Sequence, residues 1–126
     1  MNVEIHNIKD IINHNKTIIK GCYLAGPIAN TPNYKGKFTK AERTIKRIML
    51  KDFPVLNPSV LPEGLTKTKY NAITKAMVEA TSTIILLNGW ENSAGAKELI
   101  KQTNESPKKY LVIHFQEILD ELKRKR

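Results

Sequence analysis

Residues 88–96 (NGWENSAGA) combine residue types that hold a phosphate group in many proteins. Ser93 is a typical N-cap residue, so we expect a helix to begin at Ala94, with the first backbone N–H groups lacking partners inside the helix. Together with the Ser93 hydroxyl, these groups would form an anion site, and Gly95 adds no side chain to obstruct it. Trp90 could stack on a base or a ribose; the alternative is a half-buried surface tryptophan. This segment therefore predicts phosphate binding.

A second segment that could carry chemistry is Tyr23 to Ile28 (YLAGPI). Gly26 would let the backbone approach a ligand where a Cβ would clash, and Pro27 stiffens the turn. Tyr23 lies near the end of a predicted strand and could hydrogen-bond a sugar or a phosphate. From the local sequence alone, a packed tyrosine followed by an ordinary tight turn is the alternative interpretation.

Alternating strands and helices must position these segments. Runs of apolar and β-branched residues predict strands at 17–24, 53–56, 83–87 and 110–114. Helical spacing predicts helices at 38–52, at about 68–80, from about 94 onward, and at 115–122. This order is typical of an α/β fold with a parallel sheet, in which ligands bind beyond the carboxyl ends of the strands. Three loops meet that description: 25–37, 57–69 and 88–95.

The helical periodicity also predicts which side chains face the core. In the first helix the predicted inward residues are Phe38, Ala41, Ile45 and Ile48, and the terminal helix should bury Phe115, Ile118, Leu119 and Leu122. In the second helix the predicted inward residues are Ile73, Ala76, Met77 and Ala80. A basic face on the first helix consists of Lys40, Arg43, Arg47 and Lys51. We expect that face to be solvated, since no aromatic residues interleave with it.

The bulk properties are those of one small globular domain spanning 1–126, with a poorly placed segment at 1–16 (a short helix or an edge strand) and a basic tail at 123–126. The single cysteine, Cys22, excludes intramolecular disulfides and multi-cysteine metal sites. The histidines have no partners at metal-ligand spacing, so no metal site is predicted. The start of the chain lacks a signal core, and Ile84–Leu87 is too short to span a membrane. We therefore expect a cytoplasmic protein.

The net charge of +9 favours anionic partners. A nucleotide, a nucleic acid and an acidic surface all satisfy this requirement, and so does the alternative of a merely solubilising charge. Charge alone does not choose among them.

Three motifs in order give the chain a specific resemblance. YLAGPI, LNP and ILLNGWENSAGA, within Cys22 to Glu98, are similar to segments of the nucleoside 2-deoxyribosyltransferase-like superfamily, in particular its small phage-type members. The resemblance implies a flavodoxin-like three-layer sandwich with a parallel sheet of four to five strands, usually a homodimer. It also implies cleavage or transfer of the N-glycosidic bond of a deoxynucleoside or nucleoside monophosphate, without metal or cofactor.

The family's acids are missing from the matching positions. Its aspartates fall on Thr74, Ala80 and Ser82, and its nucleophilic glutamate falls on Leu99. Glu98 stands one residue early, which turns its side chain about 100° around the helix axis and, in a regular helix, outward. The remaining candidates for catalysis are Glu98, Glu91 and Tyr23, with Glu79 a weaker one. Glycosidic cleavage needs a carboxylate near the anomeric carbon, so the predicted site binds better than it reacts.

The leading hypothesis is a nucleotide-binding protein in which catalysis is weak or lost, for example one that sequesters a nucleotide. One alternative is an active N-glycosidase or deoxyribosyltransferase on nucleoside 5′-monophosphates; another is a basic protein that associates with nucleic acid. The predicted substrate-binding residues are Tyr23, Gly26, Pro27, Ile28, Asn57, Trp90, Ser93, Gly95 and Ala96.

Overall fold

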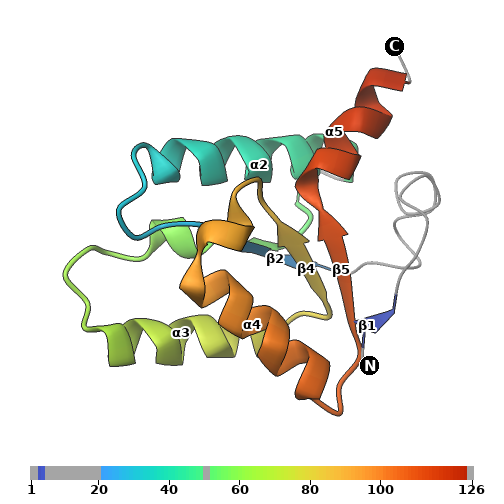
Figure 1. Cartoon of the computed structure of the whole chain (residues 1–126). Coiled ribbons are helices and arrows are strands. Elements are labelled where there is room, and N and C mark those ends of the chain that lie inside the picture. Colours follow the sequence, from blue (N-terminus) through green and yellow to red (C-terminus); the bar gives the residue numbers. More distant parts are fainter. Residues whose placement is uncertain (1–2, 5–20, 50–51, 125–126) are drawn as a thin grey trace.

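The protein is built around a parallel five-stranded sheet (Figure 1). The computed structural model describes residues 3–4, 21–49 and 52–124. Its strands are β1 (Val3–Glu4), β2 (Cys22–Ala25), β3 (Val55–Leu56), β4 (Thr83–Leu86) and β5 (Tyr110–His114). They lie in the order β1-β5-β4-β2-β3, and every neighbouring pair is parallel. The predicted α/β fold with a parallel sheet is therefore confirmed.

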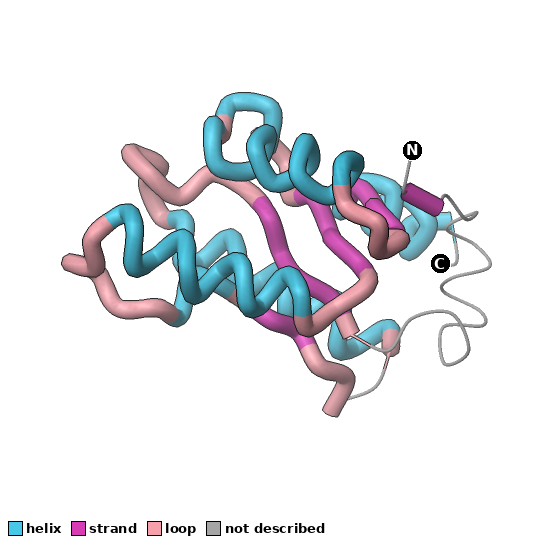
Figure 2. Tube along the Cα trace, turned by 90° about the horizontal axis from the view of Figure 1, so that it is seen from below, coloured by secondary structure: helices cyan, strands magenta, loops and turns pink. Residues whose placement is uncertain are grey.

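Helices cover both faces of the sheet and complete a three-layer sandwich. They are α2 (Tyr34–Ile48), α3 (Lys67–Glu79), α4 (Ala94–Glu105) and α5 (Phe115–Arg124), with short 3-10 turns at η1 (Pro58–Val60) and η2 (Trp90–Asn92). Helices α2 and α5 lie on one face, and α3 and α4 lie on the other (Figures 1 and 2). None of the helices in the described part of the chain is long and apolar enough to cross a membrane.

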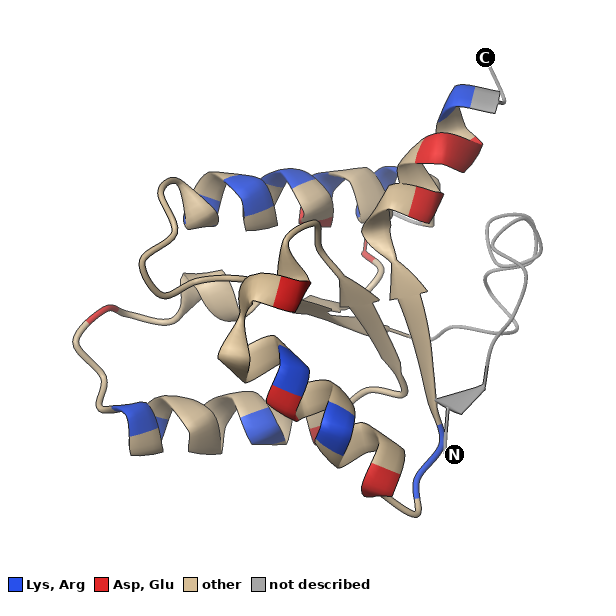
Figure 3. Ribbon diagram, in the orientation of Figure 1, with Lys and Arg blue, Asp and Glu red and all other residues tan. Residues whose placement is uncertain are grey.

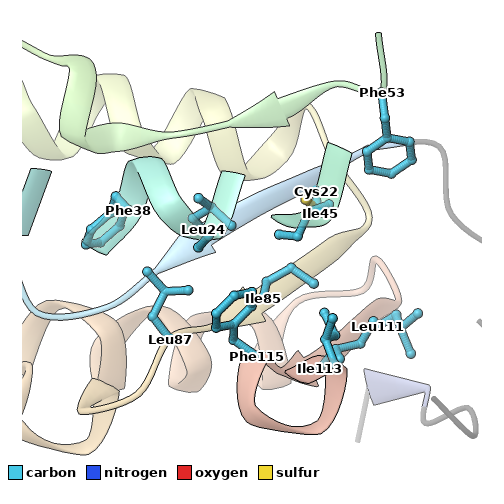
Figure 4. Packing of buried hydrophobic residues seen from close by; sticks show 12 residues of the cluster. Cys22, Leu24, Phe38, Ile45, Phe53, Ile85, Leu87, Leu111, Ile113 and Phe115 are labelled. Atoms are coloured by element: carbon cyan, nitrogen blue, oxygen red, sulfur yellow. The ribbon is translucent and has the colours of Figure 1, made fainter. Parts of the chain in front are cut away.

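The two-residue period of the strands divides the core into two clusters. Leu24 of β2 and Ile85 of β4 point to the α2 and α5 side, where they join a cluster that includes Phe38 (Figure 4). Tyr23 and Ile84 point to the α3 and α4 side. Since helices cover both faces, β2 and β4 are buried along their whole length.

The outer helices α2 and α5 match their predicted faces. Phe38, Ala41 and Ile45 are buried on α2, although the helix begins earlier than predicted and ends earlier too. On α5, Phe115 and Ile118 are buried, and Leu119 and Leu122 pack partly against the same cluster. Ile48 is also partly buried there, and Lys51 lies outside the described residues.

Of the four residues predicted to face inward on α3, only Met77 does so. Ile73 is 38% exposed, and both Ala76 and Ala80 are exposed. The buried residue is Val78, with Met77 packed beside it. Alanines contribute little to the apolar periodicity of a helix, and the half-buried Tyr70 and Thr74 were not counted as apolar. The half-buried face of α3 therefore includes polar side chains, which the apolar pattern could not indicate.

The ends of the predicted strands also shift. β2 runs to Ala25, and residues 17–20 of the predicted strand lie outside the described part. β3 pairs only through Val55 and Leu56. The N-terminal pair Val3–Glu4 forms the edge strand β1 beside β5, which is the strand alternative left open by the sequence. The rest of 1–16 and residues 125–126 are outside the described residues.

A candidate anion site at the carboxyl edge of the sheet

The loops that follow β2 and β4 leave the sheet in opposite directions. From β2 the chain crosses through α2, on one face, to β3; from β4 it crosses through α4, on the other face, to β5. Such a switch point is where open α/β sheets bind ligands. The two loops are adjacent there, since a Cβ built on Gly89 would lie 3.5 Å from Cγ of Pro27.

The start of α4 leaves two backbone donors free. Ser93 caps the helix as predicted: its Oγ accepts the N–H of Ala96 at 3.1 Å, and its carbonyl accepts the N–H of Lys97 at 3.0 Å. Within the described part of the chain, the N–H groups of Ala94 and Gly95 make no hydrogen bond. The anion site predicted over Ser93 to Ala96 is therefore narrower, because the N–H of Ala96 is already used.

Gly95 leaves these donors unobstructed. It is exposed, and a Cβ added there would meet only Ser93 Oγ, at 3.9 Å. Nothing in the packing demands glycine at this position. The opposite holds at Gly26, where an added Cβ would lie 3.0 Å from the Leu87 Cβ and 3.4 Å from the Phe38 ring. Glycine at position 26 is therefore explained by packing and not by the approach of a ligand.

The helix starts at this edge favour an anion. Helices α2, α3 and α4 all begin at the carboxyl edge, and none has an acidic residue in its first turn. A helix N-terminus carries partial positive charge that acidic residues usually offset. Here the first turns carry lysines instead, among them Lys35, Lys67 and Lys97 (Figure 3).

Tyr23 is buried beneath this edge with an unused hydroxyl. Its side chain is 6% exposed, and its Oη makes no hydrogen bond to any residue that the structure describes. Burial, and secondly the neighbouring phenol of Tyr70, raise the pKa of Tyr23 well above its usual range. The phenol therefore stays protonated and can act as a neutral donor.

Three other predicted binding residues are engaged within the protein. Asn57 is 5% exposed; its Oδ1 accepts the N–H of Ser59 at 2.9 Å, and its Nδ2 donates to Glu42 at 3.1 Å. Ile28 packs against the α2 and α5 cluster. Trp90 is half-buried against the α3 and α4 cluster, with its ring centroid 6.0 Å from that of His114.

The candidate acids do not converge on the site. Glu98 is exposed and accepts a 3.4 Å bond from Gln102, whereas Leu99 packs into the α3 and α4 cluster. This is the outward orientation that a regular α4 predicts. Glu91 is exposed on η2, and Glu79 lies in the last turn of α3, at the opposite edge of the sheet. Among the described residues, no group of three His, Cys, Asp or Glu side chains could hold a metal ion.

Three residues near this edge were missed by the sequence reasoning. Tyr34, in the first turn of α2, donates a 3.4 Å hydrogen bond from its Oη to Glu63, in the loop before α3. Tyr70 is half-buried in the first turns of α3. The length of the 57–69 loop was the available signal, because long loops in small domains are often functional.

The family comparison covers the same edge. A family model described as "Domain of unknown function (DUF4406)" matches residues 20–113, which include all three loops. No curated protein and no solved structure matches the chain.

Proposed function

We propose that this chain, which belongs to the DUF4406 family, binds a nucleotide at the carboxyl edge of its sheet and turns it over weakly or not at all. The observation that carries the proposal is the pair of free backbone donors at Ala94 and Gly95. They lie at the switch point, at a helix start that lacks acidic residues. Such a helix start suits a phosphate group. That the phosphate belongs to a nucleotide is proposed from the resemblance of the three loops to deoxyribosyltransferase-like proteins.

The weak catalysis rests on where the acids lie. A deoxyribosyl bond breaks through an oxocarbenium-like state that requires a nearby carboxylate. Leu99 takes the inward position on α4, while Glu98 and Glu91 are exposed. A bound nucleotide would therefore keep its base, and sequestration is the role that fits. Formation of a homodimer and a cytoplasmic location stay predictions.

Calorimetry with nucleoside 5′-monophosphates, the matching nucleosides and inorganic phosphate tests the binding. The monophosphates should bind more tightly than the nucleosides, because only they reach the free amides of Ala94 and Gly95. Equal affinity for nucleosides and monophosphates would count against the phosphate site. Addition of a ligand should also change the fluorescence of Trp90, the single tryptophan.

Base release measured by chromatography tests the loss of catalysis. Incubation with purine and pyrimidine deoxynucleoside monophosphates should yield little free base, and Glu98→Ala should leave that trace unchanged. Robust release that disappears in Glu98→Ala would replace the proposal with an active N-glycosidase.

The basic face of α2 favours a second candidate, association with nucleic acid. Lys40, Arg43 and Arg47 are exposed on it, and the only acid of the helix, Glu42, pairs with Lys46 at 3.3 Å. Figure 3 shows the basic residues along this helix. Binding of DNA that weakens steeply with salt, and less steeply in a Lys40→Glu, Arg43→Glu variant, would support this candidate. Affinity that depends little on salt would exclude it.

A further inference from the structure

A polar cluster lies at the same carboxyl edge of the sheet as the anion site, next to the start of α3. A 3.4 Å hydrogen bond from Tyr34 Oη to Glu63 Oε1 joins the start of α2 to the loop before α3. Both residues follow the carboxyl end of a strand, β2 for Tyr34 and β3 for Glu63. The bond therefore brings a carboxylate to the edge where the amides of α4 are free.

Two further phenols extend this cluster inward. Tyr70 is half-buried at the start of α3, and its phenol is close enough to Tyr23 to help raise the pKa of that residue. The charge of Tyr34 in turn contributes, after burial, to the raised pKa of Tyr70. Tyr23 itself is more than nine-tenths buried and lacks a hydrogen-bond partner among the described residues. That hydroxyl can therefore still donate a hydrogen bond to a ligand.

We infer that Glu63, Tyr34, Tyr70 and Tyr23 form a subsite for the sugar hydroxyls of the nucleotide. The set has no cation, so it does not suit the phosphate, which the amides of Ala94 and Gly95 hold. A carboxylate accepts hydrogen bonds from hydroxyl groups, as acidic residues do from ribose in dinucleotide-binding folds. The phenol hydroxyls can donate hydrogen bonds to the sugar oxygens. This inference rests on the proposed function.

The inference implies selectivity for the sugar. Glu63 can accept bonds from both hydroxyls of a ribose but from only one on a 2′-deoxyribose and from none on a 2′,3′-dideoxyribose. A hydrogen bond to a charged group changes affinity by about tenfold or more. Affinity should thus fall in the order ribose, deoxyribose, dideoxyribose.

The test combines ligand changes with Glu63→Gln. Calorimetry uses the best-bound ribonucleoside 5′-monophosphate with its 2′-deoxy and 2′,3′-dideoxy forms, plus inorganic phosphate alone. The wild type should lose about tenfold or more between ribose and dideoxyribose, and Glu63→Gln should flatten that series. Tyr70→Phe should weaken all sugar-bearing ligands and leave inorganic phosphate unchanged. Glu105→Gln, an exposed glutamate at the far end of α4, is the matched control and should keep the wild-type series.

The outcomes separate the two proposals. If monophosphates bind and the wild type ignores the sugar hydroxyls, or Glu63→Gln keeps the full series, the sugar subsite is overturned and the nucleotide site stands. If no monophosphate binds to the wild type, both are overturned.

Discussion

The two ends of the sheet treat their polar groups differently. At the amino end, Lys108 Nζ donates to the carbonyls of Glu79 and Thr81, and Thr81 Oγ1 donates to Val78 and Thr83. At the carboxyl end, two amides of α4 and the hydroxyl of Tyr23 have no such partners among the described residues. One group breaks the pattern: the buried Asn104 Oδ1, near the end of α4, is also unpaired.

The apolar side chains at the carboxyl end, by contrast, are closely packed. Beneath the carboxyl-end loops, Phe38 and Leu87 are buried and close against Gly26. The carboxyl end therefore has unpaired hydrogen-bond donors above closely packed apolar side chains. Donors that make no hydrogen bond in the folded protein need not give one up before a ligand arrives, which favours binding.

The largest expected effect concerns the packing under the carboxyl end. Phe38 is 1% exposed, and Phe38→Ala should lower the free energy of unfolding by about 3–5 kcal/mol through lost burial and a cavity. Denaturant unfolding measures the change. Val60→Ala, at a position that is 74% exposed, should change stability by less than about 0.5 kcal/mol. A small loss for Phe38→Ala would mean that the carboxyl end is loosely packed.

A second prediction uses the buried thiol at the amino end of β2. Burial, and then the charge of Glu42, raise the pKa of Cys22 from 9.0 to about 12. Above the unfolded pKa the unfolded chain loses a proton that the folded chain keeps. Stability is therefore full below pH 9 and falls as the pH rises toward 12, by about 1.4 kcal/mol per pH unit from this group. Cys22→Ala should flatten the decline, as unfolding curves between pH 8 and 11 would show; parallel curves would refute the prediction.

The next largest effect on stability is expected from the Lys108 hydrogen bonds at the amino end. Lys108→Met keeps most of the side-chain length but leaves the carbonyls of Glu79 and Thr81 without their charged donor. The expected loss of stability is about 1.5–3 kcal/mol. Lys109→Met removes a neighbouring exposed charge and should cost almost nothing. Equal stability of the two variants would remove the distinction between the ends.

The smallest expected effects on stability come from alanine substitutions at Gly26 and Gly95, which the sequence analysis both assigned to binding. Gly26→Ala places a Cβ 3.0 Å from Leu87 Cβ and should cost about 1–3 kcal/mol. Gly95→Ala meets no atom closer than 3.9 Å and should leave stability unchanged or raise it by about 0.5–1 kcal/mol. The reverse ranking in thermal unfolding would contradict the assignment of Gly26 to packing and of Gly95 to an open site.

The same residues show which features of the fold and of the site can be predicted from the sequence. Apolar runs and the Ser93 cap predicted β4 and the start of α4, because both depend on local pattern. The exposed position of Glu98 followed from helix geometry. The packing role of Gly26 could not be predicted, because Leu87 and Phe38 approach it from other parts of the chain. The bond between Tyr34 and Glu63 joins residues 29 positions apart, so no spacing rule could have found it.

The central claim is that the free amides at the start of α4 hold the phosphate, and Ala94→Pro tests it most directly. Ser93 has φ −105° and ψ 115°, an extended conformation that suits the residue before a proline, and the first helical position favours proline. The variant therefore removes one free N–H without breaking a bond of the fold, while Ala94→Ser keeps that N–H as the matched control. Calorimetry should show Ala94→Pro binding a nucleoside monophosphate about tenfold more weakly than Ala94→Ser, at equal stability. Equal affinity of the two variants would contradict the claim.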